Sequence, residues 1–291
     1  MFEYDKCGKY MIQRHGNMIL RMGGVDDVDS WTPLQAELVQ SRRLPDGVLE
    51  VRSAGQAKPD IFIVEIASYP DARVPSQVVC NAALSFLARG VVPEIIVLFL
   101  HEKGKVQASD SVELQSRRGL TKLNLSWKAI KLWEVPAEDL LAIGDVGLVP
   151  WVPLAKYADD PERIIRRCRA RIDAAVPPSP EHENLLAVTQ VLLGLRYNEK
   201  PLQNKLRGLL GGREAMIESP IYQEIVQESE RKGATEAMRQ AVLDVIVRRF
   251  GPPAQALEVE LKAIEFDRLR DLHGFAVGCR NLASFRKRLL S

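Results

Sequence analysis

Two acidic side chains, Asp46 and Glu65, lie in or beside predicted strands, and Glu65 is surrounded by apolar residues. Glu65 lies inside the run 60–67, DIFIVEIA, which is rich in β-branched and apolar residues and predicts a strand buried on both faces. Because an unpaired carboxylate is costly to bury, Glu65 needs a partner, a cation or the open edge of a cleft. Asp46 comes just before a second predicted strand, 48–52. The two carboxylates are therefore the first candidates for a functional site.

Strand periodicity decides which side chains share a face with Glu65. The odd-numbered residues of the run 60–67 point to one side of the sheet and the even-numbered residues to the other. The segment 53–58, SAGQAK, has turn composition, so a hairpin there folds the strand 48–52 back beside the strand of Glu65. We then expect the carboxylates of Asp46 and Glu65 to lie about 4–6 Å apart, close enough to share one cation. Two carboxylates and a nearby backbone carbonyl make an oxygen-rich site suited to Mg²⁺ or Mn²⁺.

The sequence also resembles a known nuclease signature. Pro45-Asp46, the predicted hairpin and Glu65-Ile66-Ala67 follow one another as they do in the PD-(D/E)XK superfamily. The wider chain is similar to the Rpn-like branch of that superfamily, which contains recombination-promoting nucleases and putative transposases. The segments that carry this similarity are RRLPDGVLEV, VEIASYPDARVPSQ, PEIIVLFLHEKG, IKLWEVPAEDLL, GLVPWVPL, MIESPIYQEI and FGPP.

The resemblance implies a fold, an activity and a set of ligands. The fold is α/β, a restriction-endonuclease-like mixed sheet flanked by helices, and the activity is metal-dependent cleavage of DNA, linked to recombination or mobile elements. Asp46, Glu65 and the Ile66 carbonyl are implied to bind Mg²⁺ or Mn²⁺. In the signature, a lysine two residues after the glutamate polarises the attacked phosphate.

Ala67 stands at the position of that lysine. On the helix predicted to follow, Gln77 is a candidate to orient water or phosphate in its place, and Arg73 is another because it is positively charged. The acids also have an interpretation without catalysis, in which Asp46 only begins a hairpin and Glu65 pairs with a buried arginine. A second hypothesis for the whole chain is thus a catalytically inactive nuclease-fold module that serves binding or oligomerisation.

The composition indicates a globular protein, and the net charge does not indicate whether it binds DNA. The chain has 291 residues, of which 46% are hydrophobic and 27% charged, as is typical of soluble globular proteins. The net charge is only +2, so DNA binding must come from local basic patches. The arginine-rich segment 161–175 is one such patch, although its pattern equally suits a solvated helix with i,i+4 ion pairs.

The cysteines and the hydropathy pattern bear on the compartment. Four cysteines lie far apart in the sequence and show no metal-binding spacing, which predicts reduced thiols. The first residues are too polar for a signal peptide, and no apolar run reaches the length of a membrane span. These patterns predict a cytoplasmic protein that does not enter a membrane.

Hydrophobic periodicity predicts two domains. Residues 1–157 are expected to form the nuclease-like domain, a sheet with helices on both sides, which contains a turn-rich link over 22–30 and an extended apolar cover over 147–154. From residue 160 the pattern is helical, so residues 158–291 are expected to form a helical domain through which a homo-oligomer could assemble. His101, which follows a predicted central strand, is either a base or a structural residue.

Overall fold

The computed structural model describes residues 2–26, 28–34, 45–55, 58–116, 121–158, 160–251, 257–262 and 264–290. Contacts between residues divide the chain into two compact units, Met1–Gln223 and Glu224–Ser291. Helix α8, Pro220–Phe250, begins in the first unit and continues into the second. The predicted site residues all belong to the first unit.

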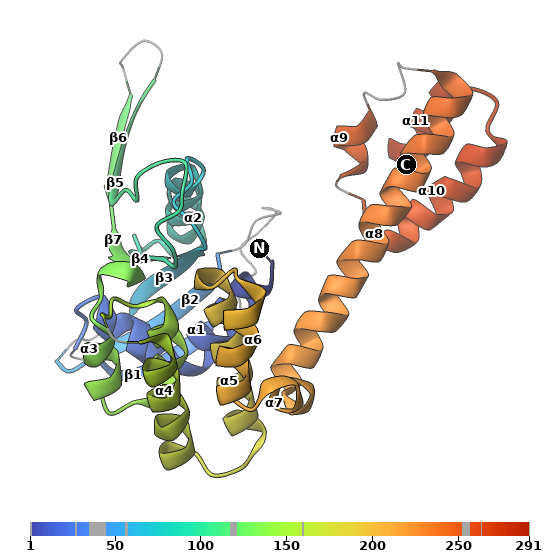
Figure 1. The fold of residues 1–291 in the computed structure, drawn as a ribbon. Coiled ribbons are helices and arrows are strands. Elements are labelled where there is room, and N and C mark those ends of the chain that lie inside the picture. The colour runs from blue at the N-terminus through green and yellow to red at the C-terminus, as the bar shows by residue number, and fades with distance from the viewer. Residues whose placement is uncertain are drawn as a thin grey trace. The chain divides into compact units, whose positions relative to one another are not determined.

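A mixed five-stranded sheet forms the centre of the first unit (Figure 1). Its strands, in spatial order, are β1 (Val28–Leu34), β2 (Gly47–Ser53), β3 (Asp60–Ala67), β4 (Glu94–Phe99) and β7 (Lys128–Lys131). The pairs β1–β2 and β2–β3 are antiparallel, and the pairs β3–β4 and β4–β7 are parallel. The predicted α/β class with a mixed sheet, a hairpin and an apolar central strand is confirmed.

Two helices cover opposite faces of this sheet. Helix α1 (Phe2–Met22) packs so closely that a side chain at Gly8 would collide with Ile66 of β3. Helix α2 (Val74–Arg89) lies on the other face, where Val78 joins a buried apolar cluster with Ile63 of β3 and Val97 of β4. Because side chains alternate along a strand, Ile66 faces α1 and Glu65 faces α2.

The beginning of the sheet differs from the predicted turn-rich link. Residues from Val28 onward form strand β1, whose ladder with β2 runs from Val28 opposite Ser53 to Leu34 opposite Val48. Local composition in this stretch is polar and turn-like, and pairing with β2 overrides it. Residues 35–44, which include Glu37, Arg42 and Arg43, lie outside the described part of the chain.

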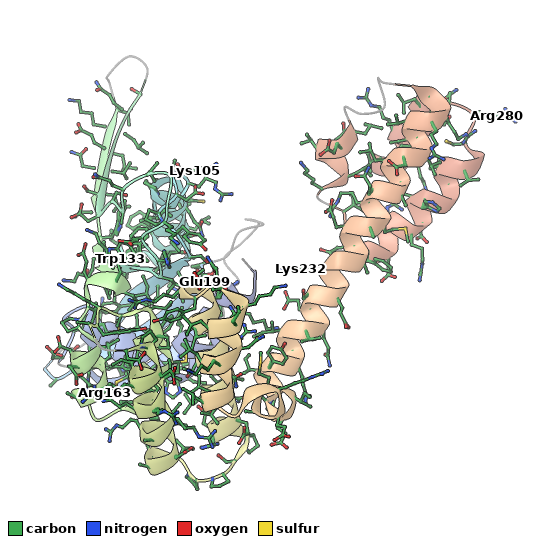
Figure 2. The ribbon with its side chains drawn as sticks, viewed as in Figure 1. Lys105, Trp133, Arg163, Glu199, Lys232 and Arg280 are labelled. Atoms are coloured by element: carbon green, nitrogen blue, oxygen red, sulfur yellow. The ribbon has the colours of Figure 1, made fainter. Side chains whose placement is uncertain are left out.

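A separate two-stranded ribbon stands between β4 and β7 in the sequence. Its strands are β5 (Ser111–Gln115) and β6 (Lys122–Ser126), which pair only with each other among the described residues. Most of its side chains are exposed, and Figure 2 shows them along both strands. Such a solvated ribbon lacks the apolar alternation by which a half-buried strand is recognised in a sequence.

The helices that follow the sheet belong to the same compact unit. After η1 (Leu132–Glu134) and α3 (Ala137–Ala142), the apolar segment η2 (Val146–Leu154) forms a buried 3₁₀ helix instead of an extended cover. The next helices are α4 (Pro161–Ala175), α5 (Pro180–Arg196), α6 (Lys200–Leu209) and α7 (Gly212–Glu218). Both α4 and α5 pack on η2, and α5 also packs on α1.

Because of this packing, the boundary between the compact units differs from the predicted domain boundary, which falls between residues 157 and 158. That position is where strands give way to helices, whereas the compact units divide between Gln223 and Glu224. The physical reason is η2, whose residues from Gly147 to Leu154 are all buried and need α4 and α5 as cover.

The second unit has a core of its own. Its helices after α8 are α9 (Glu258–Leu261), α10 (Phe266–Gly278) and α11 (Leu282–Leu290). Their fully buried residues form one apolar cluster with α8, which includes Val242, Ile246, Leu269 and Phe285. No strand occurs among the described residues after Pro161, so the predicted change to helix is confirmed. Within the same described ranges, no helix is long and apolar enough to span a bilayer.

Candidate metal-binding site

The β2–β3 ladder brings Asp46 and Glu65 to the same end of the sheet. The last ladder pair at this end is Gly47 opposite Val64. Asp46 comes one residue before Gly47, and Glu65 comes one residue after Val64. The antiparallel register therefore continues into a position where Asp46 and Glu65 are opposite each other. Glu65 is also paired in parallel with Val97 of β4, so it lies well inside the sheet.

Asp46 is fixed to the main chain of the residue that follows Glu65. Its Oδ2 accepts a hydrogen bond of 2.8 Å from the Ile66 N–H. The N–H and C=O of one strand residue point toward the same neighbour, so the Ile66 carbonyl is directed to the Asp46 side of β3. The Ile66 backbone thus faces Asp46, while the Glu65 side chain faces α2.

Two amides from α2 bind the carboxylate of Glu65. Gln77 Nε2 donates to Oε2 at 2.8 Å, and Asn81 Nδ2 donates to Oε1. The Glu65 side chain is buried, with 4% of its surface exposed. Two neutral donors therefore orient the carboxylate, which supports a positioning role for Gln77.

The geometry of α2 explains why both amides reach the same carboxylate. Gln77 and Asn81 are four residues apart and so lie one above the other on the same helical face. That face is the buried one, since Val78 and Ser85 are also buried. Asn81 is absent from the predicted site, although its spacing from Gln77 is a signal in the sequence.

The other predicted substitutes for the signature lysine lie elsewhere. Arg73 is exposed and forms two hydrogen bonds to Asp71, from Nε to Oδ1 at 2.9 Å and from Nη2 to Oδ2 at 2.8 Å. Side-chain and backbone hydrogen bonds from Arg73 hold the pKa of Asp71 at about 2. The methyl group of Ala67 packs against the apolar cluster that contains Ile63 and Val78.

Lys9 contributes a positive charge that the sequence does not place at the site. Its Nζ lies 3.6 Å from Asp46 Oδ1, and it reaches Asp46 from α1. The Lys9 side chain is 42% exposed, whereas Asp46 is only 8% exposed. Lys9 of α1 thus contacts Asp46, whereas Gln77 and Asn81 of α2 contact Glu65.

The donor set fits Mg²⁺ or Mn²⁺. Mg²⁺ in proteins often binds one or two carboxylates and keeps several waters, which leaves positions for a phosphate. Each carboxylate oxygen has a second lone pair besides the one used in the hydrogen bonds above. In the described ranges no three His, Cys, Asp or Glu side chains are grouped as metal ligands, so the protein would supply two charged ligands at this site.

His101 lies just after β4, where its backbone N–H donates to the Ser68 carbonyl at 3.1 Å. Its ring Nδ1 accepts a hydrogen bond of 3.1 Å from the Lys103 backbone N–H, so the neutral ring carries its proton on Nε2. Burial and the charge of Lys103 lower the pKa of His101. In this tautomer Nε2 is a donor, so the ring is not poised as a general base.

The arginine-rich helix α4 shows the ion pairs of a solvated face. Arg169 binds Asp173 at 2.8 Å with i,i+4 spacing, and Arg167 binds Glu138 of α3 with both terminal nitrogens. Arg163, labelled in Figure 2, lies in the first turn of the same helix. These pairs favour the solvated-face alternative over a DNA-binding helix.

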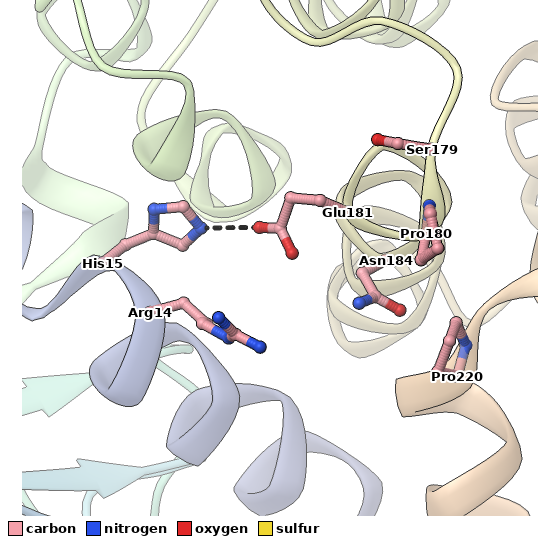
Figure 3. A pocket seen from close by; sticks show the side chains of 7 residues that line it. All are labelled: Arg14, His15, Ser179, Pro180, Glu181, Asn184 and Pro220. Atoms are coloured by element: carbon pink, nitrogen blue, oxygen red, sulfur yellow. Dashed lines mark hydrogen bonds and ion pairs between the residues drawn. The ribbon is translucent and has the colours of Figure 1, made fainter.

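A second polar constellation, which the sequence does not predict, lies between α1 and α5. It lines a pocket of about 580 Å³ (Figure 3). His15 Nε2 and Glu181 Oε1 are 3.2 Å apart, and the Tyr10 hydroxyl donates to Glu181 Oε2. His15 has φ −131° and ψ 29°, which kinks α1, and its ring packs where a side chain at position 147 would stand. The network bridges α1 to α5.

The Glu181 bridge predicts an acid-dependent contribution to stability. Burial acts to raise the pKa of Glu181, but hydrogen bonds from His15 and Tyr10 outweigh it and hold the pKa below the ordinary value of 4.5. A lowered folded-state pKa stabilises the protein above the unfolded value, and this stability is lost as the pH falls through the folded value. We therefore expect Glu181→Gln to cost about 1–2 kcal/mol at pH 7, discounted for a partly exposed carboxylate.

The difference in the free energy of unfolding between wild type and Glu181→Gln should disappear well below pH 4.5. Urea unfolding followed by tryptophan fluorescence measures the stability of the first unit, because all four tryptophans lie in it. Glu199→Gln, which changes an exposed acid of the first unit, is the control. A stability difference that stays constant from neutral pH to strongly acidic pH would contradict the ionised bridge.

No protein-family model, curated protein or solved structure matches this chain. The assignment of the site therefore depends on its geometry and chemistry. The structure joins Asp46 to the Ile66 N–H and to Lys9, and joins Glu65 to Gln77 and Asn81. Gln77, predicted to orient water or phosphate, donates to Glu65, and Arg73 is bound to Asp71.

Proposed function

We propose that the chain is a metal-dependent DNA endonuclease of the PD-(D/E)XK type, with a restriction-endonuclease-like core and a link to recombination or mobile elements. The observation that carries the proposal is the bond from the Ile66 N–H to Asp46, which joins one acid to the residue beside the other. One acid just before β2 and one on the adjacent strand β3, at one end of a mixed sheet between two helices, support the resemblance to the signature.

In this proposal Asp46, Glu65 and the Ile66 carbonyl hold Mg²⁺ or Mn²⁺. A bound divalent cation would supply Lewis-acid stabilisation of the charge that develops on a phosphodiester. The protein's own part is to fix the two carboxylates. Ile66 holds Asp46 through its N–H, while Gln77 and Asn81 hold both oxygens of Glu65. Such supporting hydrogen bonds keep ligands in a productive orientation.

A nicking assay on supercoiled plasmid DNA tests the activity. Purified full-length protein should convert the plasmid to open-circle form with Mg²⁺ or Mn²⁺ and should not do so with EDTA. Absence of nicking with both metals, by protein that is folded by circular dichroism, would refute the endonuclease proposal.

Gln77→Ala should lower the nicking rate by about 10- to 100-fold, as is typical when a group that orients a metal ligand is removed. The reason is that Glu65 keeps only the Asn81 donor from α2 and loses its fixed orientation. Ser76→Ala, an exposed neighbour on the same helix, is the control and should nick as wild type does. Equal rates for Gln77→Ala and wild type would remove Gln77 from the site.

The second candidate is a nuclease-fold module without catalysis, for which Ala67 is the specific observation. Its methyl group lies in the apolar cluster and offers no charge to a phosphate. In this case the helical second unit, which has its own core, would serve self-association or partner binding. Absence of nicking together with concentration-dependent oligomers in light scattering would favour it.

A further inference from the structure

We infer that Lys9 is the catalytic cation of this site and that its ammonium group binds the phosphate under attack. The inference rests on the proposed endonuclease function and names a residue for a role that Ala67 leaves vacant. Hydrolysis of a phosphodiester adds negative charge to the phosphoryl oxygens, and a fixed cation lowers the energy of that state. The question is which described side chain can supply it.

The position of Lys9 follows from how α1 packs on the sheet. Gly8 lets the helix approach Ile66, and Ile12 fills the space beside Gly47, so the residues on either side of Lys9 on this helix are pressed against strands β2 and β3. Lys9 is therefore carried by a helix that packs against β2 and β3. Its Nζ is 3.6 Å from Asp46 Oδ1.

The two members of the ion pair differ in exposure. Asp46 is almost buried, while 42% of the Lys9 side chain is open to solvent. A lysine has a flexible four-carbon stem and a compact charge, so its ammonium group can move several ångströms without any change in the helix. Its exposed ammonium group can therefore contact a phosphate in solvent while its stem stays beside Asp46.

Two arginines near this part of the fold have different partners. Arg73 binds Asp71 with two nitrogens. Arg14, further along α1, lines the pocket that contains Glu181 (Figure 3). Lys9 forms its ion pair with an acid of the site itself, and this contact separates it from both arginines.

The reaction balances with Lys9 as a stabilising donor. The oxygen of a water molecule forms a bond to phosphorus, the ester bond to the leaving oxygen breaks, and the water's proton ends on that oxygen. The products are a phosphate monoester and a hydroxyl group. Lys9 keeps all its protons throughout and donates a hydrogen bond to a non-bridging oxygen, where its charge offsets the added negative charge.

The ion pair between Lys9 and Asp46 has to break when the site binds a divalent cation, because the two positive charges compete for one carboxylate. Removal of Lys9 should therefore have effects of opposite sign. Lys9→Gln should bind Mg²⁺ about 2- to 5-fold more tightly, since a partly exposed ion pair of modest strength no longer competes. The same variant should nick DNA about 100- to 1000-fold more slowly, as expected for loss of one stabilising donor.

The experiment measures both quantities on the full chain. Mg²⁺ affinity is measured by isothermal titration calorimetry, and the nicking rate is measured on supercoiled plasmid. Lys9→Arg keeps the charge and should retain more than about a tenth of the wild-type rate. Lys58→Gln removes an exposed charge before β3, away from the acids, and should change neither quantity.

Each result has a separate meaning. Tighter Mg²⁺ binding with slower nicking supports the inference. A wild-type rate for Lys9→Gln overturns it and leaves the endonuclease proposal intact. Slower nicking with weaker Mg²⁺ binding also overturns it, because Lys9 would then act only by holding Asp46 in place. If wild type itself fails to nick DNA, the endonuclease proposal fails, and the catalytic role of Lys9 fails with it.

Discussion

Asp46→Asn and Glu65→Gln should each lower plasmid nicking by about 1000-fold or more while the protein stays folded. Each change replaces a charged oxygen ligand by a neutral amide of the same shape. The charge stabilisation that a bound metal provides is worth several kcal/mol, and about 4 kcal/mol corresponds to a 1000-fold change in rate. The fold should survive Asp46→Asn because the amide oxygen of the introduced asparagine can still accept from the Ile66 N–H, as the carboxylate does now.

The measurement is the initial rate of plasmid nicking with Mg²⁺, paired with calorimetric titration of the metal. Both variants should lose metal affinity together with activity. Asp60→Asn is the matched control, since it removes an acid from the opposite end of the same strand, β3. If either site variant nicks as fast as Asp60→Asn, its acid does not bind the catalytic metal.

The core of the site could be predicted because it depends on local patterns. The alternation in DIFIVEIA places Glu65 on one face of β3, and the turn-like segment before it makes the hairpin that brings Asp46 alongside. Helical spacing then carries Gln77 to the buried face of α2. Each of these steps involves residues within about one hairpin or one helix, where periodicity is informative.

The remaining parts depend on contacts between distant segments. Lys9 is remote in sequence from Asp46, and its place is set by the packing of α1 on the sheet through Gly8. Strand β1 forms against the turn-like composition of its sequence because β2 offers a ladder. Helices α4 and α5 join the first unit because η2 is apolar on all sides and must be covered. No local period encodes any of these choices.

Asn81→Leu should destabilise the first unit by about 2–4 kcal/mol, the cost of leaving a buried carboxylate without one of its donors. Asn81 is almost fully buried, and its amide donates to Glu65, which is itself buried. Leucine fills a similar volume, so the loss comes from the missing hydrogen bond and not from a cavity. Urea unfolding followed by tryptophan fluorescence reports on this unit alone, because every tryptophan lies in it.

The double variant Glu65→Leu/Asn81→Leu should regain most of that stability. Replacing a buried polar pair by apolar side chains of similar volume is often neutral or stabilising, whereas removing one partner is not. Gln77, which is only half-buried, can then turn its amide to water. The double-mutant cycle of Glu65→Leu and Asn81→Leu should give a coupling energy of about 2 kcal/mol or more, since the side chains of Glu65 and Asn81 are in direct contact. Recovery of stability with complete loss of nicking would mean that Glu65 serves chemistry at the expense of the fold. A double variant less stable than Asn81→Leu alone would contradict this and assign Glu65 and its amides a structural role.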